Sequence, residues 1–110
     1  MFGSKTEKIA KLAQKGQVAK LIGFINDKDA SVRLAAIDAL GTCAGEESYN
    51  ALVPLVHAAD ADVRAHAISA LAASGNARAR VHIEHQAKDE KDARVKQAIE
   101  KALHTLHGGE

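Results

Sequence analysis

The chain has 110 residues, 46% of them hydrophobic, and a formal net charge of +1. This length fits one domain, spanning residues 1–110, that can bury a core, and the balanced charge argues against a nucleic-acid binder with a strong basic excess. Alanine accounts for 23 residues, whereas only three residues are aromatic and one is proline. Because alanine favours helices and proline interrupts them, this composition predicts an all-α protein with closely packed helices.

A single cysteine, Cys43, excludes an intramolecular disulfide. No apolar run approaches the roughly 18 residues that span a membrane. The N-terminal sequence MFGSKTEK has no apolar segment of the kind found in signal peptides. We therefore expect a cytoplasmic protein that does not bind membranes.

The first predicted helix covers about residues 5–15. Ser4 and Glu7 have the spacing of a capping box at its start. Its apolar stripe is narrow, and lysines cover most of the remaining surface. A helix with a polar outer face suits the end of a repeat array, so we interpret it as a capping helix with a solvated basic surface.

The next two segments repeat each other without gaps at an offset of 31. Residues 21–41 read LIGFINDKDASVRLAAIDALG, and residues 52–72 read LVPLVHAADADVRAHAISALA. A third copy of the second half, DARVKQAIEKAL, follows at 92–103 with an offset of 32. A repeat of this length predicts a solenoid of stacked helix pairs. We expect three units, at about 17–43, 48–73 and 77–106.

Turn and capping residues mark the helix boundaries inside each unit. The second helices are predicted at about 30–43, 61–73 and 92–106, each preceded by an aspartate that can cap free N–H groups: Asp29, Asp60 and Asp92. The first helices are predicted at about 17–26, 48–58 and 77–88. The breaks between helices contain Gly16, Gly41, Gly45, Gly75 and Asn76. Pro54 should kink the first helix of unit two or delay its start.

Helical phase separates the core face from the stacking positions. In the second helix of unit one, the face predicted to be buried comprises Val32, Ala36, Ala39, Leu40 and Cys43. Ile37 lies at its flank, where the next unit should stack, and Ile68 is its equivalent in unit two. The equivalent in unit three is Glu100, which predicts that nothing stacks beyond it and that the three-unit array is complete. In the first helix of unit three the core candidates are Val81, Ile83 and Ala87.

The motif D-x-x-V-R-x-x-A-x-x-A-L occurs twice, as DASVRLAAIDAL and DADVRAHAISAL. It resembles the short HEAT-like repeats first associated with phycobilin lyases, over about residues 17–106. The resemblance implies an α-α superhelix, in which the motif aspartate and arginine bond across turns and between repeats. These roles fall to Asp29 with Arg33 and to Asp60 with Arg64. The third copy departs from the motif, with Lys96 in place of arginine and Ile99 in place of alanine.

The sequence contains no pattern that we interpret as catalytic. His82 with His85, and His104 with His107, have the spacing of helical metal-binding pairs, but surface histidines are the simpler interpretation. HEAT-like hydroxylases carry His-Glu dipeptides, and this chain has Glu84–His85 in the reverse order. Cys43 falls on the apolar face, where a buried and inert thiol is expected. We predict no enzymatic activity, no metal site and no cofactor.

The resemblance implies a concave binding face lined by the second helices. The residues opposite the apolar stripe are predicted to lie there: Leu34, Asp38, His66, Ser69, Gln97 and Lys101. Leu34 is the most conspicuous, because it is large, apolar and predicted to be exposed. We expect a scaffold or adaptor that binds a protein partner, itself a monomer or weak oligomer. An accessory lyase-like role with a bilin chromophore and nucleic-acid binding remain as alternatives.

Overall fold

The computed structural model describes residues 4–106, and all regular secondary structure in that range is helical. In chain order the elements are α1 (Lys5–Gln14), α2 (Val18–Ile22), α3 (Ala30–Gly41), α4 (Glu46–Leu52), the 3-10 helix η1 (Val53–His57), α5 (Ala61–Ser74), α6 (Ala79–Ala87) and α7 (Ala93–Thr105). The predicted all-α fold class is confirmed. Unit one consists of α2 and α3, unit two of α4, η1 and α5, and unit three of α6 and α7. Within 4–106, no helix is both long enough and apolar enough to cross a membrane.

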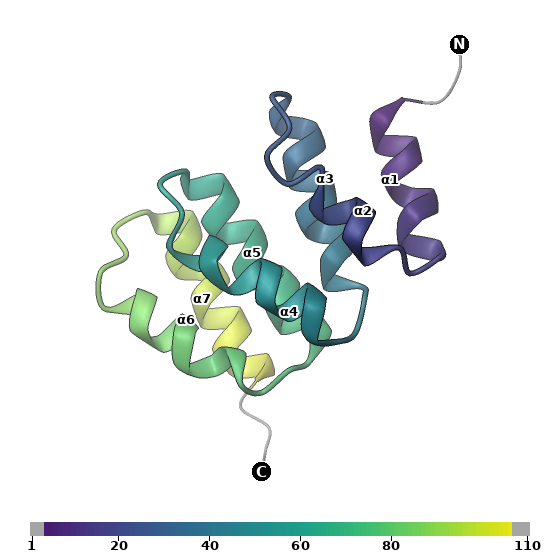
Figure 1. The fold of residues 1–110 in the computed structure, drawn as a ribbon. Coiled ribbons are helices and arrows are strands. Elements are labelled where there is room, and N and C mark those ends of the chain that lie inside the picture. Colours follow the sequence, from purple (N-terminus) through teal and green to yellow (C-terminus); the bar gives the residue numbers. More distant parts are fainter. Residues whose placement is uncertain (1–3, 107–110) are drawn as a thin grey trace.

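The helices form two layers (Figure 1). The second helices of the units lie in one layer, where α3 packs against α5 and α5 against α7. The first helices α2, α4 and α6 form the other layer. The capping helix α1 belongs to the second-helix layer, because it packs mainly on α3 and less on α2. It therefore occupies the position that the second helix of a preceding unit would take.

Aspartate caps define where each second helix begins. The side chain of Asp29 accepts a hydrogen bond from the backbone N–H of Ser31. Asp60 and Asp92 each accept from two backbone N–H groups, two and three residues further on. These bonds satisfy donors that have no partner within the helix. The capping box predicted at the start of α1 is also present, with both hydrogen bonds between Ser4 and Glu7 formed.

Pro54 interrupts the first helix of unit two, as predicted. The α-helix α4 ends at Leu52, and the chain continues as the 3-10 helix η1 with the proline near its start. Proline lacks an N–H donor and its ring clashes with the carbonyl four residues earlier, so the α-helical pattern cannot continue through it. The tighter helix carries Val56 into the core, where the side chain is fully buried.

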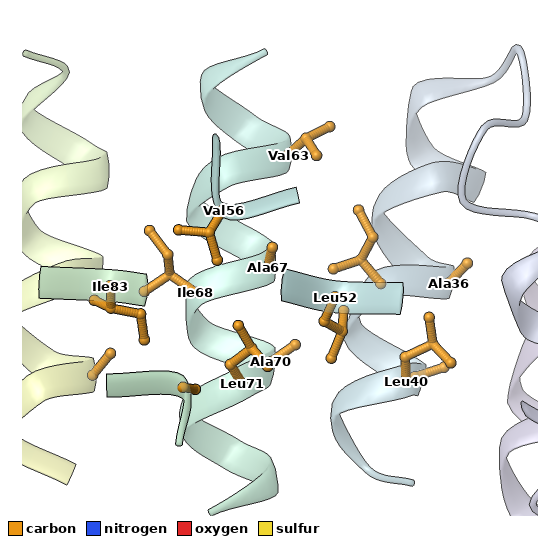
Figure 2. Packing of buried hydrophobic residues seen from close by; sticks show 14 of the residues in the cluster. Ala36, Leu40, Leu52, Val56, Val63, Ala67, Ile68, Ala70, Leu71 and Ile83 are labelled. Atoms are coloured by element: carbon orange, nitrogen blue, oxygen red, sulfur yellow. The ribbon is translucent and has the colours of Figure 1, made fainter. Parts of the chain in front are cut away.

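The core runs between the two layers and continues from unit to unit. Ile37 and Ile68 are both fully buried, as expected for stacking positions. Figure 2 shows Ile68 of α5 pointing toward Ile83 of unit three. The predicted apolar face of α3 is buried as well, including the thiol of Cys43. Burial of aliphatic side chains between units is what couples one repeat to the next.

Gly41 has a different role from the one predicted. The prediction that it separates two helices is wrong, because Gly41 is the last residue of α3 and is buried. A Cβ atom at this position would lie 2.8 Å from both Cα and Cβ of Ala70 in α5. The missing side chain therefore allows the backbones of α3 and α5 to approach closely.

The first helix of unit three buries a different stripe from the predicted one. Ile83 is fully buried as expected, but Val81 is 63% exposed and Ala87 is exposed too. Ala79 is buried in their place. Ala79 and Ile83 are four residues apart and share a helix face, which Val81 opposes. In α7, Glu100 is exposed, whereas Ile99 is buried at the position where the motif has alanine.

Candidate binding surface

The outer side of the helix layer formed by α1, α3, α5 and α7 is the candidate binding surface, and we name it the second-helix face. Two hollows lie on it, each between neighbouring helices. One of about 470 Å³ lies between α1 and α3. The other, of about 260 Å³, lies between α5 and α7. Both expose more apolar than polar surface. The second-helix face therefore has a shallow apolar hollow on either side of the α3–α5 contact.

The hollow between α5 and α7 brings two of the predicted site residues together. Ser69 and Lys101 line it, and both are exposed. Its floor is made of alanines from the two helices: Ala72, Ala73, Ala98 and Ala102. Small side chains leave space between helices that pack closely at their inner sides. Gln97 is exposed on α7 but does not line this hollow.

Asp38 and His66 form a polar contact across the second-helix face. The Oδ1 atom of Asp38 in α3 lies 2.8 Å from Nδ1 of His66 in α5. Their side chains are 57% and 38% exposed, respectively. Exposed pairs of this kind contribute little to stability, so both groups can exchange this contact for one with a bound partner.

The prediction that Leu34 is exposed is wrong. Its side chain is half-buried and packs against the core cluster. Leu34, Ile37 and Gly41 follow one another at spacings of three and four, so they lie on one stripe of α3. That stripe reaches the contact between α3 and α5, where the close approach at Gly41 leaves little room for solvent. Leu34 therefore packs against the core instead of projecting from the second-helix face.

The hollow between α1 and α3 was not predicted as part of the site. Its apolar lining is shared by α1 and α3: Ile9, Ala10, Ala13, Ala35 and Ala39. Asp38, Thr6, Gln14 and Thr42 line its polar parts. One side of α1 has no lysine and carries small residues at helical spacing: Thr6, Ala10 and Ala13. This stripe is the sequence signal that could have revealed the hollow. The capping helix thus extends the binding surface instead of only closing the array.

The motif arginines bind the loops that precede the second helices. Nη1 of Arg33 donates to the carbonyl oxygens of Asp27 and Lys28. Nη1 of Arg64 makes the equivalent bonds to Ala58 and Ala59. The motif aspartates bond within their own helix caps instead of to these arginines. Arginine and aspartate of the motif therefore fix the same turn from two sides.

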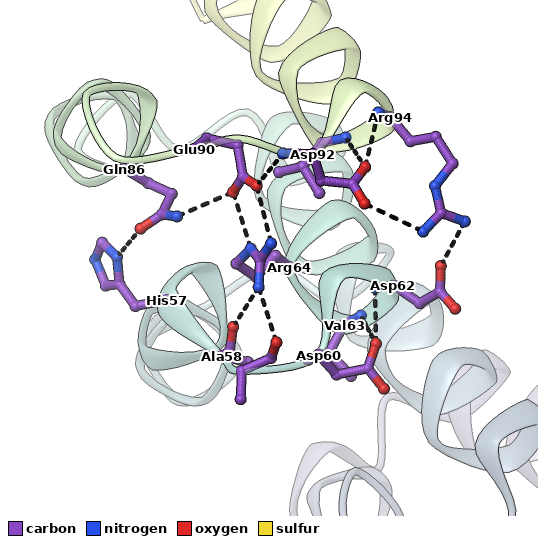
Figure 3. Close-up of polar contacts among 12 residues, drawn as sticks. His57, Ala58, Asp60, Asp62, Val63, Arg64, Gln86, Glu90, Asp92 and Arg94 are labelled. Carbon is purple, nitrogen blue, oxygen red and sulfur yellow. Dashed lines mark hydrogen bonds and ion pairs between the residues drawn. The ribbon is translucent and has the colours of Figure 1, made fainter.

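Arg64 also connects unit two to unit three (Figure 3). Its Nε and Nη2 atoms donate to the two carboxylate oxygens of Glu90, at 2.8 and 2.9 Å. The side chain of Glu90 is only 1% exposed. At the offset of 32 between units two and three, the residue equivalent to Glu90 is Ala58, so Arg33 faces no equivalent carboxylate in unit two. The resemblance implied bonds between the motif aspartate and arginine, whereas the contact between repeats in the structure joins Arg64 to Glu90.

Hydrogen bonds hold Glu90 in its charged form. The guanidinium of Arg64 lowers the pKa of Glu90 from 4.5 to about 2, although burial opposes the shift. The side-chain amide of Gln86 and the backbone N–H of Asp92 donate to the same carboxylate. The Oε1 atom of Gln86 in turn accepts a hydrogen bond from Nδ1 of His57 at 2.6 Å. A continuous polar chain therefore runs from Arg64 to the end of η1 (Figure 3).

A second ion pair joins the same two units closer to solvent. Nη1 of Arg94 lies 3.0 Å from Oδ1 of Asp62 in α5. The Arg94 side chain also contacts Asp92, which lowers the pKa of Asp92 and raises that of Arg94. Both side chains of the Arg94–Asp62 pair are more than half exposed. This pair therefore adds less to the junction than Arg64 and Glu90 do.

His82 and His85, which have the spacing of a metal-binding pair, contact different rings. His82 is half-buried and its ring packs edge-on against Tyr49, whereas His85 is exposed and lies beside His57. His104 is exposed on α7, and His107 lies outside the described residues. Within 4–106, no group of three or more metal-ligating side chains comes together.

Two layers of paired helices, linked by a repeated Asp-x-x-Val-Arg turn, define an α-solenoid of helical repeats. Residues 18–104 match the family of HEAT repeats, and the chain belongs to that family. The match covers all three units and begins at α2. A search of curated protein sequences finds no significant match. The likeness of the motif to phycobilin-lyase repeats stays a prediction.

Proposed function

We propose that this chain is a protein-interaction module that binds a segment of a protein partner on its second-helix face. HEAT repeats commonly serve as scaffolds for other proteins, and solenoids present extended surfaces for this purpose. The observation that carries the proposal is the presence of two apolar hollows on one face. They lie on opposite sides of the α3–α5 contact, so one partner segment that crosses the four helices meets both.

The charges around the hollows favour a protein over a nucleic acid. Asp38 lines the hollow between α1 and α3, and Lys101 lines the one between α5 and α7. A phosphate backbone requires a continuous basic surface, which an aspartate at this position opposes. A peptide with a basic group at one end and an acidic group at the other would match both rims. We accordingly propose a binding module without catalytic activity.

The experiment is site-specific photo-crosslinking in an extract of the native host. One bait carries the photo-reactive group at Ser69 on the second-helix face, and the control bait carries it at Asn50, which is exposed on α4. We expect discrete crosslinked proteins from Ser69 that are absent from Asn50. Identical products from both positions, or products from Asn50 alone, would contradict the proposed face.

Matched double variants test the same surface by charge. Ser69→Arg with Lys101→Glu alters the second-helix face, and Asn50→Arg with Lys88→Glu makes the same changes at exposed positions of the first-helix layer. The partner identified by crosslinking should bind the first variant at least tenfold more weakly and the second with unchanged affinity. Circular dichroism establishes that both variants are folded. If a bilin or a nucleic-acid duplex binds the wild type and no protein does, the alternative functions replace this one.

A further inference from the structure

Two histidine rings from successive units meet beside the η1–α6 contact. His57 is the last residue of η1, and His85 lies in the last turn of α6. Their ring centroids are 6.0 Å apart, and the ring planes stand at 84°. Both residues are exposed. Neither lies on the second-helix face, so this pair is separate from the proposed partner-binding surface.

Gln86 determines which nitrogen of His57 is free. The Nε2 amide group of Gln86 donates to the carboxylate of Glu90, which can only accept. The amide oxygen of Gln86 therefore faces Nδ1 of His57, at 2.6 Å. An oxygen acceptor requires that Nδ1 carry the proton, and in the neutral ring this leaves Nε2 with its lone pair available. Metal-binding histidines are held in the same way, by a hydrogen bond from the second ring nitrogen to a carbonyl or carboxylate oxygen.

The separation of the rings suits one ion between them. A zinc–nitrogen bond of about 2.0–2.1 Å places the metal about 3.2 Å from each ring centroid. When the nitrogen–zinc–nitrogen angle is tetrahedral or wider, the two ring centroids lie roughly 5–6 Å apart. The observed 6.0 Å lies at the upper end of that range. Imidazole nitrogen suits Zn²⁺, Ni²⁺ and Cu²⁺ in particular.

We propose that His57 and His85 bind one divalent transition-metal ion and that Gln86 positions His57 for this role. With no third metal-ligating side chain nearby among the described residues, water completes the coordination shell. The ion joins η1 of unit two to α6 of unit three. The ion therefore stabilises the same junction between units two and three as the buried ion pair of Arg64 and Glu90. Binding is reversible, because an ion with only two protein ligands exchanges readily.

The test is titration of the untagged full chain with Zn²⁺ and Ni²⁺ by calorimetry at pH 7.5. We expect one ion per chain, and at least a tenfold loss of affinity in His57→Ala and in His85→Ala. His82→Ala and a variant with His104→Ala and His107→Ala are the controls and should bind as the wild type does. Unchanged binding in His57→Ala, or an equal loss in either control, would overturn the assignment.

Three further measurements separate metal binding from general surface effects. Nitrogen-15 spectra of the metal-free protein should show the His57 ring protonated at Nδ1. The variant Gln86→Met removes the oxygen acceptor, so it should bind Zn²⁺ more weakly although both histidines remain. Saturating Zn²⁺ should raise the melting temperature of the wild type but not of His85→Ala. A His57 ring protonated at Nε2, or an equal rise of the melting temperature in His85→Ala, would refute a metal ion bound between the two units.

Discussion

Replacement of Glu90 by glutamine removes one charge from the contact between units two and three and keeps the shape of the side chain. In the wild type, Arg64 holds the pKa of Glu90 at about 2, against 4.5 for the free group. At about 1.4 kcal/mol for each unit of pKa, this lowering by about 2.5 corresponds to at most about 3.5 kcal/mol of stability at neutral pH. The Arg64 side chain is 16% exposed, so screening by solvent reduces this contribution to stability. We therefore expect Glu90→Gln to lower the free energy of unfolding by about 2 kcal/mol at pH 7.

The pH dependence of this loss identifies its origin. Between pH 4.5 and 2 the unfolded chain binds a proton at Glu90 that the folded chain does not, so acidification through this range destabilises the fold. The stability contributed by Glu90 is fully present above about pH 5. It is lost as the pH falls through about 2, so the difference in stability between wild type and Glu90→Gln should shrink to a small part of its neutral value by pH 2.5. Asp27, Asp29 and Asp92 also have lowered pKa values, but their contributions are common to both proteins and cancel.

Urea denaturation followed by circular dichroism, at several pH values from 7 to 2.5, measures this difference. Glu100→Gln is the control, because Glu100 is an exposed carboxylate on α7 and its replacement should change stability little at any pH. Hydrogen exchange should localise the effect of Glu90→Gln to unit three. A loss of stability that is the same at pH 7 and pH 2.5 would refute the assignment of Glu90 as a buried carboxylate paired with Arg64.

Four other variants, at three positions, test the packing and the caps. Gly41→Ala should destabilise the protein by about 1–3 kcal/mol in denaturant unfolding, because the new Cβ meets backbone atoms of Ala70 at 2.8–3.0 Å; an unchanged midpoint would disprove the close approach. Ile68→Glu should cost more than about 3 kcal/mol, because it buries a charge, and hydrogen exchange should show loss of protection in α7; equal protection would disprove the stacking role of Ile68. Asp92→Ala should lower the unfolding midpoint by less than Ile68→Glu does, and Asp92→Asn should restore most of it, since both Asp and Asn cap helices. Equal midpoints for these two Asp92 variants would argue against the cap.

The position of α1 makes this capping helix part of the proposed binding surface. Its lysines satisfy the requirement for a polar end, while Ile9 and its neighbouring alanines pack toward α3. The resulting hollow between α1 and α3 is the larger of the two on the second-helix face. Removal of α1 would therefore remove part of the proposed binding surface as well as the cap on unit one.

The sequence by itself determined the helices, their caps and the stacking positions. These features depend on local rules: the 31-residue repeat, helical phase and aspartates before each second helix are readable along the chain. Ile37 and Ile68 could be assigned as buried because each repeats at the same position in its unit. An irregularity of the first helix of unit two at Pro54 could be predicted for the same reason, since its effect is confined to neighbouring residues.

Only the tertiary structure decided which residues from different units meet. Glu90 lies in a loop outside the repeat motif, so nothing in its local sequence marks it as the partner of Arg64. Gly41 resembles a turn glycine in the sequence, and only the packing of α5 against α3 brings Ala70 so close that a side chain would not fit there. Leu34 is half-buried because it packs against the core cluster. The pairing of His57 with His85, in place of His82 with His85, likewise depends on how α6 rests on η1. Such contacts depend on distances between helices, which the order of residues along one helix does not specify.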